Sequence, residues 1–236
     1  MSLLFVNCNN VNTAPKKINT KSKVDSINVM GQNNARYKLI KYNFYINIDD
    51  DLISFKKYYA NEIDKDFVYD SLYDGTLYVY KNDSNITKTT ISNFIDTQSI
   101  SLLDNLKTYY VDKHFVYYFH GTSDGGDLTI ISGADPKTFR RISNSQYVCD
   151  NKYVYYQYSV LPGLIPKETV CLSDTINPNH DGYIKDKKIV YYELDRIDSA
   201  DANSFKLIND NGADAMDKKY FYKAGQIYKV KEKWRK

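Results

Sequence analysis

A short pattern of polar and apolar positions recurs five times along the chain. Each copy begins with an aspartate and a polar or basic neighbour, and a run of β-branched and aromatic residues follows. Such a run is typical of a β-strand, and an aspartate before it can bond its own backbone to form a turn. The pattern therefore predicts five turn–strand units. The copies span residues 64–69, 112–118, 150–156, 186–192 and 217–222.

The spacing of the copies predicts a repeat with variable loops. The leading aspartates lie 48, 38, 36 and 31 residues apart (64 to 112, to 150, to 186, to 217). Because successive side chains of a strand point to opposite faces, Phe115 and Tyr117 share one face and Val116 and Tyr118 the other. A glycine after the strand, Gly121 in the second copy or Gly225 in the fifth, then allows a hairpin turn. The unit is thus predicted to contain a β-hairpin.

A second motif accompanies the first. In it an aspartate lies four residues before a phenylalanine. A serine or threonine directly precedes the phenylalanine, and a basic residue directly follows it. Asp135 and Pro136 favour a helix start, so we expect a one-turn helix pinned by Phe139. The copies span residues 51–56, 135–140 and 201–206, with a decayed copy at 163–169 and a remnant at 91–94.

One hairpin with one helical turn cannot bury its own aromatic residues, so neighbouring units must stack. The predicted fold is mainly β, an elongated array of stacked hairpin-plus-turn units with little long helix. The best helical spacing, at residues 50–63, predicts one short helix. We divide the chain into a disordered or tether-like N-terminus (1–34), a repeat domain (35–229) and a frayed basic tail (230–236).

At these motifs the chain resembles the DKNYY family, bacterial proteins built from repeats of the type Asp-Lys-Asn-x-Val-Tyr-Tyr. The segment Gly-Ala-Asp-Pro-Lys-Thr-Phe, which commonly follows the strand in that family, is whole at residues 133–139. The resemblance covers roughly residues 51–229. It implies a repeat fold and an exported or lipid-anchored protein, and it implies no activity.

Composition narrows the function classes only a little. The chain has 236 residues, of which 42% are hydrophobic and 26% charged, and its net charge of +3 gives no strong nucleic-acid signature. No apolar run approaches the roughly 18 residues that a membrane helix needs. Tyrosine is the most distinctive residue, with 24 copies.

The cysteines raise two further questions. Cys8 follows the apolar residues 3–6 and precedes a polar stretch that runs to about residue 34, which is how a bacterial lipoprotein begins. A signal peptide needs an apolar run of about 7–15 residues, so lipidation of Cys8 requires a start upstream of Met1. With such a start we expect the bacterial envelope, and without it a disordered cytoplasmic N-terminus. Cys149 and Cys171 are expected to be buried free thiols, with a disulfide between them as the alternative.

Few residues point to chemistry. His114 and His120 are expected on one strand face, but no third metal ligand lies near them, so no metal or cofactor is predicted. The glycine-rich residues 121–127 are interpreted as a hairpin tip, with weak calcium binding as the alternative. No nucleophile–base pairing is evident, so we expect no enzymatic activity.

The tyrosines carry the functional hypothesis. Tyr118, Tyr156 and Tyr192 occupy one slot in successive copies, and if they faced outward they would form an aromatic strip suited to a protein partner. The alternative is that tyrosine fills the core of the repeat.

We therefore predict a non-enzymatic protein-binding repeat module with one protein partner, of which an inhibitor or immunity protein is the concrete version. Two alternatives stay open. The first is an envelope-anchored structural lipoprotein, attached to the membrane only through Cys8. The second is a cytoplasmic inhibitor of a defence effector that targets nucleic acid.

Overall fold

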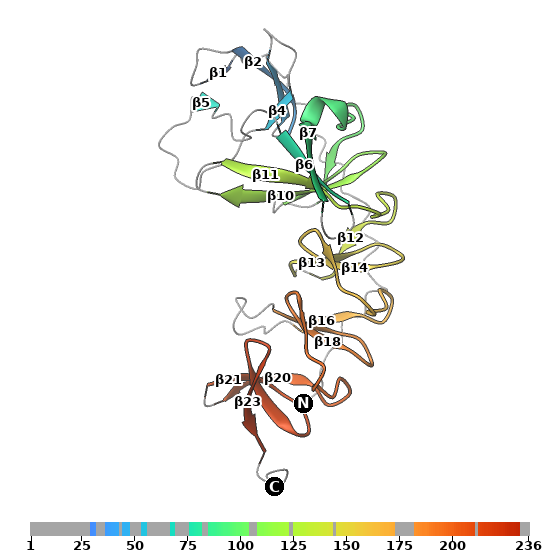
Figure 1. Cartoon of the computed structure of the whole chain (residues 1–236), viewed down its shortest axis with the longest axis vertical. Coiled ribbons are helices and arrows are strands. Elements are labelled where there is room, and N and C mark those ends of the chain that lie inside the picture. Colours follow the sequence, from blue (N-terminus) through green and yellow to red (C-terminus); the bar gives the residue numbers. More distant parts are fainter. Residues whose placement is uncertain are drawn as a thin grey trace. The chain divides into compact units, whose positions relative to one another are not determined.

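The chain folds almost entirely into β-strands (Figure 1). The computed structural model describes residues 29–31, 36–42, 44–47, 53–55, 67–68, 76–81, 85–103, 108–122, 125–143, 145–172, 182–210 and 212–231. These residues fall into two compact units, one ending at Lys137 and the other beginning at Thr138. The predicted mainly β class is confirmed. The described part of the chain contains one helical element, the 3₁₀ helix η2 (Ile91–Asn93), and no helix long and apolar enough to cross a membrane.

The unit that ends at Lys137 contains two sheets. The first has the strand order β4-β3-β2-β1-β5, with β5 parallel to β1. The second has the order β7-β6-β11-β10-β9-β8, with β11 parallel to β6. The strands are β1 (Val29–Gly31), β2 (Arg36–Lys41), β3 (Phe44–Asn47), β4 (Ile53–Phe55), β5 (Phe67–Val68), β6 (Thr76–Lys81), β7 (Asn85–Thr90), β8 (Ser101–Leu102), β9 (Tyr109–Val111), β10 (Val116–Thr122) and β11 (Gly125–Ile130).

The unit that begins at Thr138 contains three four-stranded antiparallel sheets. In each sheet every strand pairs with the next strand in sequence. The first sheet comprises β12 (Arg140–Arg141), β13 (Tyr147–Cys149), β14 (Val154–Tyr156) and β15 (Ser159–Val160). The second comprises β16 (Val170–Leu172), β17 (Tyr183–Lys185), β18 (Val190–Tyr192) and β19 (Asp195–Arg196). The third comprises β20 (Lys206–Asp210), β21 (Ala213–Met216), β22 (Tyr220–Lys223) and β23 (Gln226–Val230).

The predicted turn–strand pattern forms one inner strand of each of these three sheets and one inner strand of the six-stranded sheet in the first unit. We call β10, β14, β18 and β22 the tyrosine strands, because each carries the aromatic run of one copy. In the second unit each tyrosine strand turns back into the last strand of its sheet, and we call β15, β19 and β23 the return strands. The first residue of each turn has a positive φ: Gln157 (55°), Glu193 (51°) and Ala224 (44°).

The turn between β22 and β23 leads to a stability prediction. Ala224 and Gly225 both have positive φ, 44° and 78°, which is the geometry of a type I′ hairpin. A left-handed backbone costs a residue with a Cβ about 1–2 kcal/mol, part of which glycine returns as unfolded-state entropy. We expect Ala224→Gly to raise the free energy of unfolding by about 0.5 kcal/mol in urea denaturation.

The same exchange at a residue with ordinary φ provides the control. Ala200 is half-buried and has no positive φ. At Ala200 glycine relieves no backbone strain, and it loses more conformational entropy on folding than alanine does. Ala200→Gly should therefore lower the free energy of unfolding by about 0.5–1 kcal/mol. If Ala224→Gly and Ala200→Gly changed the free energy of unfolding in the same direction, the prediction would be wrong.

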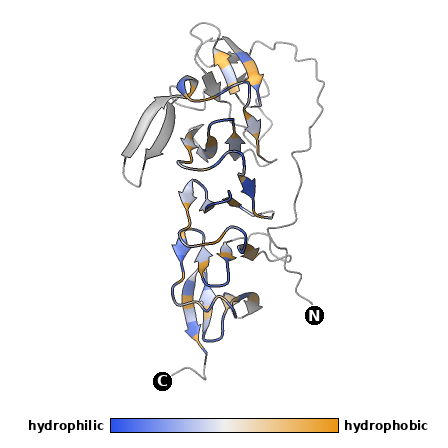
Figure 2. Ribbon diagram, turned by 90° about the vertical axis from the view of Figure 1, so that its right-hand side faces the viewer, coloured by the Kyte–Doolittle hydropathy of each residue, from blue (hydrophilic) through white to orange (hydrophobic). Residues whose placement is uncertain are grey.

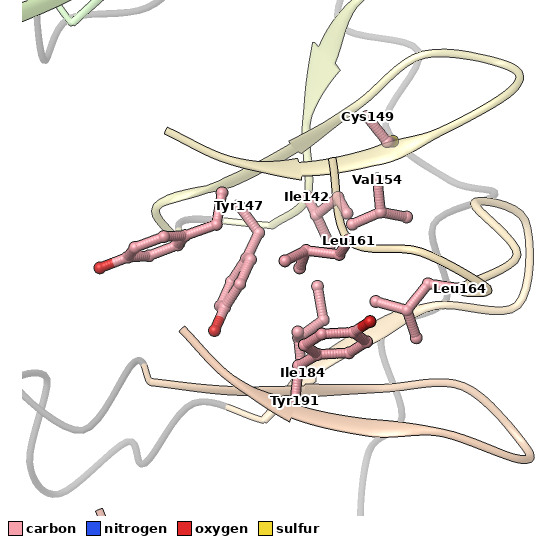
Figure 3. Close-up of a cluster of buried hydrophobic side chains, with 9 residues drawn as sticks. Ile142, Tyr147, Cys149, Val154, Leu161, Leu164, Ile184 and Tyr191 are labelled. Atoms are coloured by element: carbon pink, nitrogen blue, oxygen red, sulfur yellow. The ribbon is translucent and has the colours of Figure 1, made fainter. Parts of the chain in front are cut away.

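The sheets of the second unit are joined by shared hydrophobic cores. One core lies between the β12–β15 and β16–β19 sheets and includes Tyr147, Leu161 and Tyr191 (Figure 3). Another joins the β16–β19 and β20–β23 sheets and includes Phe205 and Tyr222. Hydrophobic residues, orange in Figure 2, accordingly occur in successive sheets and not in one block.

The middle sheet contributes to both cores. Ile184 and Tyr191 belong to the first core, whereas Tyr183 and Val190, their neighbours in sequence, belong to the second. Both faces of this sheet are therefore buried. This double burial explains why β18 is continuously apolar instead of alternating with polar residues.

The two sheets of the first unit also share a core. Phe44 from β3 packs edge-on against Tyr110 from β9, with ring centroids 5.3 Å apart. Tyr117 and Leu128, both fully buried, extend this cluster into β10 and β11.

Several local predictions differ from the structure in the first unit. The helix expected at 50–63 is contradicted at Ile53–Phe55, which forms β4 and pairs with β3, with Phe55 opposite Phe44. The rest of that segment lies outside the described residues. The first turn–strand copy is represented by β5, which pairs in parallel with β1 and not in a hairpin. Gly121 lies within β10 opposite Gly126, so the hairpin tip falls beyond it.

The second motif forms turns where one-turn helices were expected. In the copy at 201–206 the Ser204 N–H donates to the Asp201 carbonyl at 3.1 Å, and residues 135–138 and 165–168 are turns as well. The predicted terminal boundaries also shift. Val29–Gly31, inside the expected tether, form β1, and Lys231, inside the expected tail, donates its N–H to the Lys219 carbonyl.

Candidate functional site

The repeated aspartates form buried turns. Asp112, Asp150, Asp186 and Asp217 are each at most 4% exposed. In each, Oδ1 accepts the backbone N–H groups of the residues two and three positions later, at 2.6–2.8 Å. We call these four residues the aspartate turns. The predicted turn role of the aspartates is therefore confirmed for four copies, and the fifth, Asp64, lies outside the described residues.

In three of the four aspartate turns, the second carboxylate oxygen binds a tyrosine of the strand that follows the turn. Oδ2 accepts the phenol of the tyrosine five residues later in three copies, from Tyr117 (2.7 Å), Tyr155 (2.8 Å) and Tyr222 (2.9 Å). Burial, and next the hydrogen bond to the carboxylate, raises the pKa of these three phenols well above the ordinary value. The phenols are thus held neutral as donors.

The copy at Asp186 departs from this pattern. There the Tyr191 phenol donates to the Pro162 carbonyl at 2.9 Å. Oδ2 of Asp186 instead accepts the Ile165 N–H at 3.2 Å. The Asp186 carboxylate therefore binds the segment that precedes its sheet and not the tyrosine of its own strand.

The second motif binds to the aspartate turns. The N–H of Asp201 donates to Asp217 Oδ2 at 2.8 Å, and the N–H of Asp96 donates to Asp112 Oδ2 at 3.0 Å. A serine lies three residues after Asp201 and Asp96, and its Oγ accepts the backbone N–H of the residue that follows the turn aspartate. These bonds are Lys218 N–H to Ser204 and Lys113 N–H to Ser99, both at 3.0 Å. The lysines there, Lys218 and Lys113, also form ion pairs with Asp201 and Asp96.

This geometry corrects the predicted remnant at 91–94. Those residues form η2 and the turn after it, whereas the copy of the second motif begins at Asp96. Asp96 and Asp201 both precede their turn aspartate by 16 residues, and a serine follows each at the third position. The missing phenylalanine, replaced by Ile100, concealed this copy in the sequence.

The Asp201–Lys218 pair predicts a pH dependence. The hydrogen bond from Lys218, and next that from Ser204, lowers the pKa of Asp201 from 3.8 to about 2. A depressed folded-state pKa contributes stability above the unfolded value, and that contribution is lost as the pH falls toward the folded value. We expect the urea midpoint of Asp201→Asn to lie below that of the wild type above pH 4, and the gap to close between pH 4 and pH 2.

A partial variant tests the cause. Ser204→Ala removes one donor to the carboxylate and leaves Lys218 in place. Its gap to the wild type should be smaller than that of Asp201→Asn and close over the same pH range. A gap that stays constant from pH 5 to pH 2 would show that the charge of Asp201 is not responsible.

The tyrosines predicted to form an outward strip are packed inside. Tyr118 and Tyr156 are 7% and 8% exposed, and Tyr192 is half-buried. Each ring packs on the tyrosine directly opposite on the preceding strand, with centroid distances of 5.3 Å (Tyr109–Tyr118), 5.2 Å (Tyr147–Tyr156) and 4.8 Å (Tyr183–Tyr192). The expected strip is therefore not exposed at this slot, and Tyr156 and Tyr192 lie in or against the cores shared by neighbouring sheets of the second unit.

Two of those opposite tyrosines link successive sheets, a role that the sequence did not reveal. The Tyr147 hydroxyl donates to the Gly182 carbonyl at 2.6 Å and accepts the Glu193 N–H at 2.8 Å. The Tyr183 hydroxyl likewise donates to Asp214 at 2.7 Å and accepts the Gly225 N–H at 2.8 Å. These partners lie 31 to 46 residues away in sequence, so no local pattern signals the contacts.

The remaining candidate residues show no common site. His114 lies in a turn and His120 on β10, both exposed, and the described residues contain no group of three or more metal-ligating side chains. Cys149 and Cys171 form no disulfide, so that alternative is wrong; Cys149 is buried in the core and Cys171 is half-buried against it, so the expected burial holds for Cys149 alone. Cys8 and His180 lie outside the described residues, as do residues 123 and 124 of the glycine-rich tip.

Most of the exposed large apolar side chains of the second unit lie on or beside the return strands. Val160 on β15 is 37% exposed, Leu194 in the turn before β19 is 49% exposed, and Ile227 and Tyr228 on β23 are 47% and 52% exposed. An open hollow of about 440 Å³ lies between β19 and the β22–β23 turn. Its lining includes the Arg196–Asp198 ion pair, with Nε and Oδ1 2.7 Å apart, and Ile227.

Comparison with known proteins supports the interpretation of the repeats. No curated protein and no solved structure matches the chain. The family model of the DKNYY family matches residues 109–234, which is more than half of the chain and contains the four aspartate turns. The chain therefore belongs to the DKNYY family.

Proposed function

We propose that this chain is a non-enzymatic protein-binding module whose binding surface is formed by the return strands. We also propose that its repeating unit is a hairpin with its preceding turn, stacked sheet on sheet into an elongated array. The observation that carries the binding proposal is the exposure of Val160, Leu194, Ile227 and Tyr228 on or beside these strands.

The position of these side chains favours a partner over chance exposure. The return strands are the last strands of three sheets that share cores in sequence order. Large apolar side chains that recur at equivalent edges form the kind of surface that protein interfaces use. Arg196 on β19 adds a side chain that is common at interface centres, and it lines the open hollow beside Ile227.

The use of the polar groups supports a binding role over catalysis. The carboxylates of three aspartate turns accept hydrogen bonds within the fold, and the donors are the phenols of Tyr117, Tyr155 and Tyr222. Residues engaged in this way hold the scaffold rigid, and a rigid scaffold suits recognition because little entropy is lost on binding. An inhibitor or immunity protein is the concrete form of this proposal.

A pull-down from the native host tests the proposal. The tagged full chain, a chain starting at Ala35 and the triple variant Val160→Lys, Leu194→Lys and Ile227→Lys are compared by mass spectrometry. We expect one stoichiometric partner with the first two proteins and its loss with the triple variant, since three lysines would oppose burial of that surface.

A matched surface variant gives the control. Ile165 is 44% exposed but begins a turn and belongs to no return strand, so Ile165→Lys should retain the partner. Equal loss with Ile165→Lys would contradict the assignment to the return strands. No partner, with the full chain in the lipid fraction, would favour the structural lipoprotein instead.

A further inference from the structure

The return strand β23 differs from the other two in length and exposure. It has five residues, whereas β15 and β19 have two each. It is the last strand of its sheet, and four of its five residues are exposed. A strand of this length at a sheet edge offers enough backbone for another strand to pair with it.

The register shows which backbone groups face the open edge. Lys231 donates its N–H to the Lys219 carbonyl at 2.9 Å, and Lys229 lies opposite Phe221. Residues between two such pairs in an antiparallel ladder point their N–H and C=O groups away from the partner strand. Val230, opposite Tyr220, therefore presents both groups to the edge that β22 does not cover.

The edge at β23 is only partly protected, by Lys229 within the strand and by a register irregularity in its pairing with β22. Proteins commonly guard an edge strand by making it short or by placing charges in its middle. β19 follows that rule, with two residues that are both charged, Asp195 and Arg196. β23 has one charged residue, Lys229, beside the exposed Ile227 and Tyr228, and Tyr228 has the largest exposed fraction among the exposed large hydrophobic side chains.

The charges around β23 indicate the kind of strand that fits. Lys223 and Lys229 are exposed near its two ends. Lys231 is engaged within the fold, since its ammonium donates to the Asp217 carbonyl at 2.5 Å and lies 5.2 Å from the Phe221 ring centroid. The hollow beside Ile227 also holds Asp195 and the Arg196–Asp198 ion pair, so the two lysines leave a net positive charge around an apolar centre, which complements acidic side chains flanking apolar ones.

We propose that β23 binds an extended acidic segment of a partner protein, which adds to the β20–β23 sheet as a fifth strand. This inference rests on the proposed protein-binding function and names the mode of recognition. Main-chain hydrogen bonds through Val230 supply affinity, and Lys223 and Lys229 select acidic sequences. A second copy of the chain fits less well, because pairing through Val230 would place Lys229 opposite Lys231 of the other copy.

Peptide binding tests the proposal directly. Two fluorescein-labelled octapeptides, one alternating Glu and Val and one alternating Lys and Val, are titrated with the full chain and followed by fluorescence anisotropy. We expect saturable binding of the Glu–Val peptide and at least a tenfold weaker response to the Lys–Val peptide. Equal affinity for both peptides would overturn the proposed selectivity.

Two variants separate backbone pairing from charge. Val230→Pro removes a donor that faces the open edge and no bond to β22, so Glu–Val binding should fall about tenfold or more while the thermal midpoint stays near that of the wild type. Val230→Ala keeps the N–H and should keep the binding. Lys223→Glu with Lys229→Glu should reverse the preference toward the Lys–Val peptide. Wild-type affinity in Val230→Pro would refute strand addition.

The pull-down partner distinguishes this inference from the broader proposal. A partner that is lost from the triple return-strand variant but retained by Val230→Pro would leave protein binding intact and overturn strand addition. A concentration-dependent dimer of the wild type that Val230→Pro abolishes would identify a second copy as the occupant and also overturn the acidic partner.

Discussion

Replacing Asp150 with alanine is expected to lower the free energy of unfolding by about 3–5 kcal/mol. Asp150 is 1% exposed and accepts the N–H groups of Lys152 and Tyr153 and the phenol of Tyr155. Alanine removes all three bonds to a charged acceptor and leaves the buried phenol without this partner. Urea denaturation followed by circular dichroism measures the loss.

Two further variants establish that the carboxylate geometry is responsible. Asp150→Asn keeps one carbonyl oxygen for the two N–H groups, so it should cost only about 1–2 kcal/mol. Asp198→Ala removes a carboxylate that is 81% exposed, and should change the free energy of unfolding by less than about 0.5 kcal/mol. If Asp150→Ala were no worse than Asp198→Ala, the aspartate turns would not be the structural centre of the repeat.

Gly225→Ala should be the other severe substitution, with an expected loss of about 2–4 kcal/mol. Gly225 has a φ of +78°, and a Cβ there would lie 2.7 Å from Cβ and 3.0 Å from Cγ of Tyr192. These atoms are close to the backbone of β18 and cannot swing aside. The substitution therefore strains both the turn and the contact between two sheets, and a thermal melt should show the loss.

Gly133 separates those two effects. Its φ of +77° is almost the same, but a Cβ there would meet nothing within 4 Å. Gly133→Ala should thus cost only the left-handed backbone, about 1–2 kcal/mol. Equal losses at Gly133 and Gly225 would show that the approach of Tyr192 to the turn has no energetic weight.

The sequence predicted the strands well where local chemistry determines them. The turn at Asp150 was predictable because aspartate side chains tend to accept hydrogen bonds from the backbone nearby. The strand after it was predictable because Val154, Tyr155 and Tyr156 are β-branched or aromatic. Four of the five copies are strands of this kind, each paired antiparallel with both of its neighbours. These features depend on neighbours in sequence, so a single chain reveals them.

Prediction was weaker where packing between sheets decides the outcome. Tyr156 could face outward or inward by its sequence alone, because a strand buried on both faces shows no alternation. The Tyr147 and Tyr183 hydroxyls bond partners in the next sheet, and no local pattern records such distant contacts. The copy at 51–56 matched by residue type, yet Ile53 and Phe55 pair with Ile46 and Phe44 in a sheet.

The two-sided middle sheet has a consequence for how such chains change length. Its Ile184 and Tyr191 fit the sheet before it, and its Tyr183 and Val190 fit the sheet after it. A duplicated sheet inserted in frame therefore meets a complementary surface on either side, as in other quasi-one-dimensional proteins. Unequal duplication of the gene would lengthen or shorten the protein by whole sheets, while the outermost sheets and the edge at β23 kept their own character.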